Sequence, residues 1–380
     1  MEADPPVTVR ATLRAGACAL IGLALTLAGC APSRAAPSPA PTATLIAEPT
    51  APPPTATSTA ITPTVAVAPS ATSAEPSTAA PTAVAPGETP TPPAVSRLLF
   101  VSERDGDLEI YRIDADGSNL VQLTDSDAAE TDPAWSPDGT RIAYTSTWWG
   151  DPDIFLMNAD GGDVVQITRH HAADSWPVWS PDGRWLAFAS DRGGLDRFSL
   201  YRVPADCRAP DTGTGAGGAK ACEALVEAIT GADGGTDVYP AWSPGERIVY
   251  ASDRGSVSGF DIYTVLPGEA PTRLIASAHT DWFPRWSPGG EQVAFASGGT
   301  GAFQLYVADR DGANVRAVTT GGATPVGFPA WSPDGTRLAF VGVANGARDV
   351  YMIDAAGGEP VRLTDDGQVI AVGDWALTPR

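Results

Sequence analysis

The sequence contains very little lysine, histidine or cysteine. Of its 380 residues only Lys220 is a lysine, three are histidine and four are cysteine, and 45 acidic against 24 basic side chains give a formal net charge of −21. A nucleic-acid-binding protein needs a basic surface to neutralise phosphates, so this charge excludes that class. Four cysteines are too few for a disulfide-rich scaffold, and three histidines leave little material for a zinc site or a Ser-His-Asp triad.

The sequence also lacks an apolar run long enough to span a bilayer. The longest run, residues 15–28, follows Arg10 and Arg14, an arrangement typical of a secretory signal peptide. It ends in Leu-Ala-Gly-Cys at residues 27–30, which resembles the lipobox of bacterial lipoproteins. The resemblance implies cleavage before Cys30 and attachment of a lipid to Cys30. We therefore expect a lipoprotein signal peptide over residues 1–29; the alternative is an ordinary signal peptide in which Cys30 has no role.

Residues 30–95 form a segment with almost no charge and no aromatic side chains. It holds 16 of the 36 prolines, and most of the remainder is alanine, threonine, serine and valine. Such a composition cannot bury enough apolar surface to offset the entropy of ordering the chain. We predict a disordered, extended Pro/Ala/Thr-rich tether between the lipid anchor and a folded domain.

The motif Trp-Ser-Pro recurs along the rest of the chain. Its copies begin at Trp135, Trp179, Trp242, Trp286 and Trp331, with a degenerate sixth at Trp375. The spacings are 44, 63, 44, 45 and 44 residues, so one unit carries an insertion of about 19 residues. Each unit contains four short strand-like segments separated by Asp-Gly, Gly-Gly or Ser-Pro-Asp-Gly turns. Four strands at a period near 44 residues are typical of a β-propeller blade.

The two ends of the repeat region complement each other. The strand at residues 98–102 has no Trp strand before it, and the strand around Trp375 has no strands after it. Joining them completes a sixth blade and leaves no open sheet edge. We therefore predict an all-β fold, a six-bladed propeller of four-stranded blades over residues 96–380. This segment carries all 11 tryptophans and a net charge of −19.

The sequences Trp-Ser-Pro-Asp-Gly, Ile-Ala-Tyr and Asp-Ile-Phe, at residues 135–139, 142–144 and 153–155, carry a family resemblance. They resemble the WD40-like (PD40) repeat of TolB-type six-bladed propellers, and the likeness extends over residues 96–380. It implies the propeller fold. That family has a folded α/β domain before its propeller, where this sequence has the lipobox and the tether.

The insertion lies in the third blade, at about residues 207–226, and is bracketed by Cys207 and Cys222. A Gly/Ala-rich insertion needs a covalent constraint, and disulfides persist in exported proteins. We predict a disulfide between these two cysteines.

Four carboxylates precede the Trp strands at equivalent positions: Glu130, Asp174, Asp237 and Asp281. If the Trp strands are innermost, these side chains border the mouth of the central channel, where aromatic residues also occur. Such a site suits a basic peptide segment or a divalent cation such as calcium, and no other cofactor is predicted. The alternative is structural: the carboxylates cap backbone N–H groups of neighbouring blades.

Two loop features complete the candidate sites. Trp148 and Trp149 are adjacent in a loop, and paired loop tryptophans are typical of contact with a ligand or partner. Ser-Asp-Arg-Gly occurs at residues 190–193 and 252–255, and we expect these arginines to form ion pairs between blades.

Together these features predict a lipid-anchored extracytoplasmic protein of a bacterial cell surface or periplasm. We expect a monomer whose propeller binds an envelope protein or polymer, favouring a basic partner because of its negative charge. The sequence contains no Gly-x-Ser-x-Gly elbow, and we predict no catalytic residue. Two alternatives stay open: a lyase or hydrolase that acts on an extracellular polymer through a metal or carboxylate site at the channel mouth, and a structural platform without a specific ligand.

Overall fold

The computed structural model describes residues 95–194, 197–207, 222–231, 234–256, 259–298, 303–320 and 326–378. The predicted signal peptide, lipidated Cys30 and nearly all of the tether lie outside these ranges. Among the described residues, no helix has the length and apolar character needed to cross a membrane.

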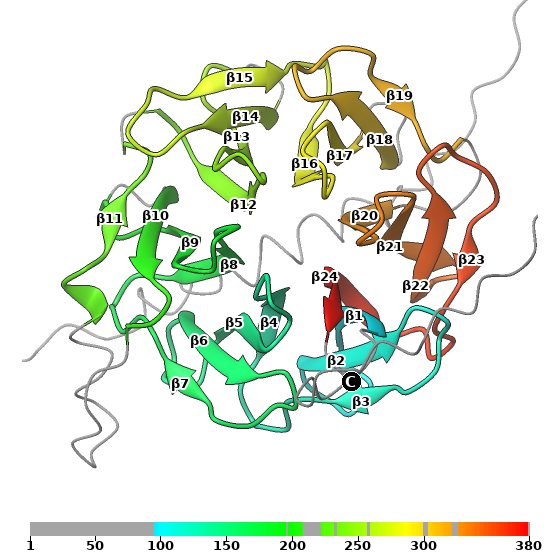
Figure 1. Cartoon of the computed structure of the whole chain (residues 1–380), viewed down its shortest axis with the longest axis horizontal. Coiled ribbons are helices and arrows are strands. Elements are labelled where there is room, and N and C mark those ends of the chain that lie inside the picture. Colours follow the sequence, from blue (N-terminus) through cyan, green and yellow to red (C-terminus); the bar gives the residue numbers. More distant parts are fainter. Residues whose placement is uncertain are drawn as a thin grey trace, which may run out of the picture. The chain divides into compact units, whose positions relative to one another are not determined.

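Six four-stranded antiparallel sheets are arranged as blades around a central axis (Figure 1). From the axis outwards, blade 1 consists of β24 (Val369–Thr378), β1 (Val95–Ser102), β2 (Glu109–Asp114) and β3 (Val121–Gln122). Blade 2 consists of β4 (Glu130–Trp135), β5 (Arg141–Ser146), β6 (Asp153–Asn158) and β7 (Val165–Gln166). Blade 3 consists of β8 (Asp174–Trp179), β9 (Trp185–Ser190), β10 (Ser199–Pro204) and β11 (Glu227–Ala228). Blade 4 consists of β12 (Asp237–Trp242), β13 (Ile248–Ser252), β14 (Asp261–Val265) and β15 (Thr272–Ile275). Blade 5 consists of β16 (Asp281–Trp286), β17 (Gln292–Ser297), β18 (Gln304–Asp309) and β19 (Arg316–Ala317). Blade 6 consists of β20 (Val326–Trp331), β21 (Arg337–Ala344), β22 (Ala347–Asp354) and β23 (Val361–Arg362).

The second strand of each blade forms the core. In β5 all residues from Ile142 to Ser146 are buried, and β9 is buried in the same way from Leu186 to Ser190. These strands are apolar on both sides because neighbouring blades cover both faces of each sheet. An aromatic residue here pairs with one on the third strand, as in Tyr144 and Phe155, whose ring centroids lie 5.7 Å apart. The repeated aromatic columns of the sequence are therefore packing positions.

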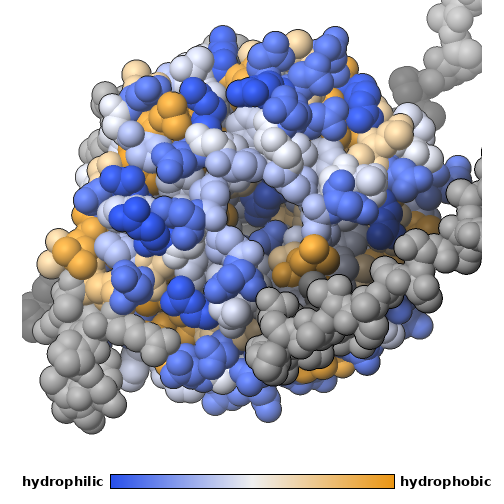
Figure 2. All heavy atoms as spheres, viewed as in Figure 1, coloured by the Kyte–Doolittle hydropathy of each residue, from blue (hydrophilic) through white to orange (hydrophobic). Residues whose placement is uncertain are grey.

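The two ends of the propeller close the ring in blade 1. β24 pairs antiparallel with β1, and Trp375 lies opposite Leu98. The predicted six-bladed fold, with a blade completed by both ends of the domain, is confirmed. Figure 2 shows one face of this ring, on which hydrophilic residues prevail and which is hollowed at its middle.

The insertion of blade 3 lies between β10 and β11. Cys207 and Cys222, at its two ends, are joined by a disulfide with a Cα–Cα distance of 5.5 Å. The residues between 208 and 221 are outside the described ranges.

Every inner strand contains a β-bulge against its neighbour. In blades 2 to 6 the residue before the strand's proline lies at the bulge with a positive φ between 54° and 58°: Asp132, Trp176, Tyr239, Phe283 and Phe328. A non-glycine residue in this left-handed region is strained by about 1–3 kcal/mol. A bulge re-aims the side chain that it carries, and here it turns this position of each blade towards the axis.

Candidate functional site

The four predicted carboxylates begin the inner strands of four successive blades. Each is at most 3% exposed: Glu130 in β4, Asp174 in β8, Asp237 in β12 and Asp281 in β16. Each accepts a side-chain hydrogen bond from a serine or arginine of its own blade or of the loop that leads into it. None lines the cavity on the propeller axis. The structure therefore distributes them over separate environments.

In blades 3 and 4 the carboxylate is neutralised by an arginine. Asp174 forms an ion pair of 2.7 Å with Arg192, and Asp237 forms one of 2.5 Å with Arg254. Both arginines belong to the Ser-Asp-Arg-Gly loops, and both pairs lie within a blade. The expectation of pairs between blades is therefore wrong for these two loops. The physical reason for the pairing within a blade is the strand register, which places Asp174 opposite Ser190. The arginine two residues after Ser190 therefore folds back over the carboxylate.

In blade 2 the equivalent carboxylate, Glu130, lies beside a second carboxyl group. Glu130 accepts hydrogen bonds from the hydroxyls of Ser126 at 3.0 Å and Ser146 at 2.9 Å. Burial and the neighbouring carboxylate of Glu109 raise the pKa of Glu130 to about 7, and the serine hydrogen bonds oppose this rise. Glu109, at the start of β2, is 1% exposed, accepts a hydrogen bond from the Ser126 N–H at 2.7 Å, and lies within hydrogen-bonding reach of the Glu130 carboxyl group.

A pocket of about 580 Å³ opens beside Glu130. Trp148 and Trp149 line it and are 58% and 61% exposed. Tyr144 and Arg169 line it as well, and the Arg169 guanidinium lies 5.5 Å from the centre of the Trp149 ring. The structure thus brings three of the predicted ligand-binding residues, Glu130 and the two tryptophans, into one site, which we call the blade-2 pocket. Asp174, Asp237 and Asp281 are not part of its lining.

In blade 5, Asp281 accepts a hydrogen bond from the Ser277 hydroxyl at 3.1 Å. Burial raises its pKa to about 6. The hydroxyls of Ser297 and Ser277 oppose this rise, and the neighbouring carboxylate of Asp261 adds to it.

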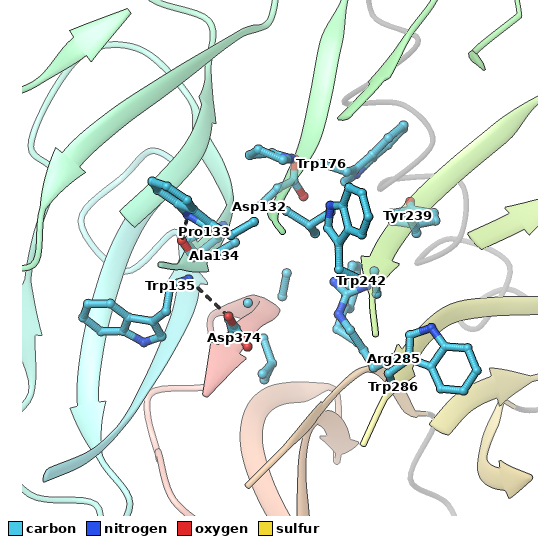
Figure 3. Close-up of a pocket in the computed structure, with 18 of the residues that line it drawn as sticks. Asp132, Pro133, Ala134, Trp135, Trp176, Tyr239, Trp242, Arg285, Trp286 and Asp374 are labelled. Carbon is cyan, nitrogen blue, oxygen red and sulfur yellow. Dashed lines mark hydrogen bonds between the residues drawn. The ribbon is translucent and has the colours of Figure 1, made fainter. Parts of the chain in front are cut away.

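A second cavity, of about 180 Å³, lies on the axis of the propeller (Figure 3). Three charged side chains line it: Asp132 from β4, Arg285 from β16 and Asp374 from β24. Asp374 accepts hydrogen bonds from the backbone N–H groups of Trp135 at 3.1 Å and Trp375 at 2.8 Å. Burial raises the pKa of Asp132 to about 6, raises that of Asp374 and lowers that of Arg285. One cation and two carboxyl groups from three blades, each half-buried, therefore line the same space on the axis.

Aromatic rings from neighbouring blades pack together at this cavity, and Trp176, Tyr239 and Phe328 line it. Trp176 and Tyr239 have ring centroids 4.6 Å apart, Tyr239 and Phe283 are 4.5 Å apart, and Phe283 and Phe328 are 4.0 Å apart. These side chains come from four successive blades, and the ring centroids of Tyr239 and Phe328 also lie 6.5 Å apart. The axial cavity is therefore bounded by packed aromatic side chains, which favours a structural role for it.

Several residues of these sites were not predicted from the sequence. Glu109 depends on the approach of blade 1 to blade 2, and Arg285 and Asp374 depend on contacts between blades that lie far apart in the chain. Asp132 does carry a signal, because it is the one charged residue at a position that is aromatic in blades 3 to 6. In the described part of the chain, no three His, Cys, Asp or Glu side chains are grouped so that they could hold a metal ion.

Comparisons with known proteins agree with this architecture. The family model described as PD40, TolB beta propeller domain, matches residues 63–168. A protein TolB homolog of Chlorobaculum tepidum is 53% identical over 45 residues, which are 12% of this chain and 10% of that protein. The chain thus spans about a tenth of the length of that relative.

Two solved structures share the fold. TolB from Acinetobacter baumannii superimposes with a TM-score of 0.60 at 20% identity, over 74% of this chain and 66% of that one. A putative TolB from Agrobacterium tumefaciens gives a TM-score of 0.56 at 21% identity, over 73% of this chain and 91% of that one. The in-register repeats and the six closed blades show a six-bladed β-propeller with the fold of these TolB structures, and residues 63–168 match the PD40 model.

Proposed function

We propose that this protein is a lipid-anchored extracytoplasmic lipoprotein whose propeller binds an envelope protein or polymer without catalysing a reaction. The observation that carries the proposal is the blade-2 pocket, where Trp148 and Trp149 stand exposed beside the buried carboxyl group of Glu130. Exposed aromatic side chains around a hollow are typical of interaction sites, and tryptophan is among the residues that contribute most to binding. The net charge of −21 favours a basic partner.

The extracytoplasmic location rests on three observations. Residues 27–30 resemble a lipobox, and the propeller resembles that of the periplasmic TolB protein. The disulfide between Cys207 and Cys222 belongs to an oxidising compartment. We accordingly propose a signal peptide over residues 1–29, a tether over residues 30–95 and a propeller over residues 96–380.

Anchoring is tested with the variant Cys30→Ser. Mass spectrometry of the mature wild-type chain is expected to show a lipid on an N-terminal Cys30, and the protein is expected to partition with membranes. Cys30→Ser is expected to lack the lipid and to remain in the aqueous phase. A wild-type chain that carries no lipid would contradict the proposed anchor and leave the binding role to be tested separately.

Binding is tested by affinity capture from an envelope extract with the full chain and with the double variant Trp148→Ala/Trp149→Ala. A species retained by the wild type and lost by the double variant supports the proposal. Leu225→Ala is the matched control, because Leu225 is also exposed, at 50%, but lies in blade 3. Equal retention by all three chains, or no retention by any, would contradict a binding role for this pocket; the second result favours a structural platform.

One observation favours the alternative of an enzyme acting on an extracellular polymer. A carboxyl group with a pKa of about 7, as in Glu130, suits general acid or base catalysis near neutral pH. Turnover of a polymer by the wild type and its loss in Glu130→Gln would establish this alternative. Turnover that persists in Glu130→Gln, or the absence of turnover by the wild type, would exclude an enzyme that acts through Glu130.

A further inference from the structure

The repeats allow the blade-2 pocket to be compared with the same place in blade 3. There the guanidinium of Arg192 donates to Asp174 at 2.7 Å and to the Ser190 hydroxyl at 3.0 Å. It lies over the rings of Phe188 and Tyr201, 5.3 Å and 5.2 Å from their centres. A buried carboxylate, a serine and two aromatic rings thus form a binding site for a guanidinium group within the fold.

Other blades repeat this arrangement. In blade 4, Arg254 binds Asp237 and Ser252 and lies 5.8 Å from the centre of the Tyr263 ring. In blade 1, the guanidinium of Arg104 lies over the rings of Phe100 and Tyr111, 5.4 Å and 4.5 Å from their centres, and forms an ion pair with Asp366. The site therefore recurs in three blades with arginine as its occupant, although in blade 1 the carboxylate comes from the loop before β24.

Blade 2 has the same framework but a different residue at the arginine position. The backbone N–H of Trp148 donates to Ser146 Oγ at 3.2 Å, as that of Arg192 donates to Ser190 Oγ at 3.2 Å. Glu130 stands where blade 3 has Asp174, and the rings of Tyr144 and Phe155 stand where it has Phe188 and Tyr201. The Trp148 side chain is 58% exposed. Carboxylate, serine and rings are thus retained, while the chain's own guanidinium is replaced.

The two buried carboxyl groups beside this pocket also have no ion pair of their own among the described residues. Glu109 lies beside Glu130, as Asp153 lies beside Asp174 in blade 3. In blade 3 this pair of carboxyl groups has Arg192 as its counter-charge. In blade 2 neither Glu109 nor Glu130 has an ion-pair partner within 4.0 Å among the described residues. A buried carboxylate without a counter-charge is costly, so a cation from outside is stabilised here.

We propose that the blade-2 pocket binds an arginine side chain of a partner polypeptide, with the guanidinium against Glu130 and over the rings of Tyr144 and Phe155. The proposal rests on the proposed binding function and names the chemistry that the pocket recognises. A planar guanidinium matches a carboxylate and stacks on aromatic faces, which an ammonium group does less well. The pocket volume of about 580 Å³ exceeds that of one side chain, so the residues that flank the arginine contact Trp148 and Trp149.

Arg169, which lines the pocket, lowers its affinity for a cation. Its guanidinium is held over the Trp149 ring, at 5.5 Å, and its side chain lines the pocket. A second guanidinium that enters is repelled by it, because like charges oppose one another at this range. Arg169→Gln is therefore expected to strengthen binding of a cationic ligand, whereas it would weaken binding of an anionic one.

The test uses the full chain and three pentapeptides, Gly-Gly-X-Gly-Gly, in which X is arginine, lysine or citrulline. Citrulline has the shape of arginine without its charge. Calorimetric titration at pH 8 is expected to give saturable binding of the arginine peptide, at least tenfold tighter than that of the citrulline peptide and tighter than that of the lysine peptide. Equal affinities for the arginine and citrulline peptides overturn the proposal.

Two variants locate the site. Trp148→Arg restores the arginine of blades 3 and 4. We therefore expect the chain's own guanidinium to occupy the pocket and the affinity for the arginine peptide to fall at least tenfold. Glu130→Gln is expected to lower the affinity for the arginine peptide by a similar factor. Leu225→Arg adds the same charge at an exposed position in blade 3 and is expected to leave the affinity unchanged. Unchanged binding by Trp148→Arg, with circular dichroism that shows a folded chain, overturns the proposal.

The outcomes separate this inference from the proposed function. If Trp148→Arg and Glu130→Gln still capture the species that Trp148→Ala/Trp149→Ala loses, the binding function stands and the arginine site is wrong. If the double variant captures everything that the wild type captures, the proposed function fails, whatever the peptides do.

Discussion

Arg192 and Asp174 form an ion pair of 2.7 Å in which the carboxylate is fully buried and the arginine is 10% exposed. The first prediction concerns this pair. Arg192→Ala is expected to lower the free energy of unfolding by about 3–5 kcal/mol, because it leaves a buried charge without its partner. Chemical denaturation at pH 7 measures the change.

Arg310→Ala is the matched control for this variant. Arg310 pairs with Glu291 at 3.5 Å, but both side chains are at least 67% exposed. The loss in free energy of unfolding is expected to stay below about 1 kcal/mol, because water screens an exposed ion pair. Equal effects of the two variants would show that the pair in blade 3 does not stabilise the blade.

The second prediction concerns the pH dependence of stability. The pKa of Glu130 in the folded chain, about 7, lies above its ordinary value of 4.5, so the folded state holds this proton more tightly than the unfolded state. Its stabilising contribution is present below about pH 4.5 and is lost as the pH rises to about 7. Relative to the wild type, Glu130→Gln is therefore expected to gain about 1–3 kcal/mol in free energy of unfolding between pH 5 and pH 8.

Several other charged and titratable groups surround Glu130. Glu109 on β2 raises its pKa, and Asp125, Arg169 and Tyr144 line the same pocket. Asp174→Asn, at the same position in blade 3, is expected to lower stability at pH 8, because it removes the buried carboxylate from Arg192 and leaves that arginine only its ion pair with Glu223. A pH profile of Glu130→Gln that is parallel to the wild-type profile would contradict the account of this carboxyl group.

The same site predicts how arginine binding depends on pH. A guanidinium binds the ionised form of Glu130, so its affinity is expected to rise about tenfold from pH 6 to pH 8, as the ionised fraction of a group with a pKa of about 7 rises. Titrations in buffers of different ionisation enthalpy are expected to detect proton release at pH 7. An affinity that falls over this range would exclude Glu130 as the counter-charge.

A fourth prediction tests how closely the closing strand approaches blade 2. A Cβ atom on Gly373 of β24 would lie against the carbonyl oxygen of Pro133 and 2.7 Å from its Cγ. Gly373→Ala is expected to lower the free energy of unfolding by about 1–3 kcal/mol through overpacking. Gly289→Ala, where no atom lies within 4 Å, is expected to leave it unchanged or raise it by about 0.4–1 kcal/mol. Equal effects would contradict the described contact between β24 and β4.

The fifth prediction concerns the disulfide that brackets the insertion in blade 3. Cys207 and Cys222 are separated by 15 residues, and cross-linking a loop of this length stabilises a protein by about 3 kcal/mol. The double variant Cys207→Ser/Cys222→Ser is expected to lose this amount in urea unfolding, and a reductant is expected to destabilise the wild type but not the variant. A wild-type curve that is insensitive to reductant would contradict the prediction.

The fold could be predicted because its signals are periodic. Trp135 and its five counterparts mark the inner strands, and the unpaired strand at residues 98–102 predicts closure with the strand around Trp375. Both inferences need only spacing and the avoidance of open sheet edges.

The details of the site depend on register and on contacts between blades, which spacing does not contain. The direction of Arg192 follows from the pairing of Asp174 with Ser190, so its partner lies inside the blade. The approach of Glu109 to Glu130 brings together the third strand of blade 1 and the first strand of blade 2, with β3 between them in the sequence. Comparing the blades, however, does single out Trp148, because it stands where blades 1, 3 and 4 have an arginine.

The most direct measurement of the central claim is a crystal structure of the full chain with the arginine pentapeptide. The account predicts the guanidinium within hydrogen-bond distance of the Glu130 carboxylate and over the rings of Tyr144 and Phe155, with the flanking peptide against Trp148 and Trp149. A peptide bound at another face, or one whose arginine points away from Glu130 into solvent, would contradict it.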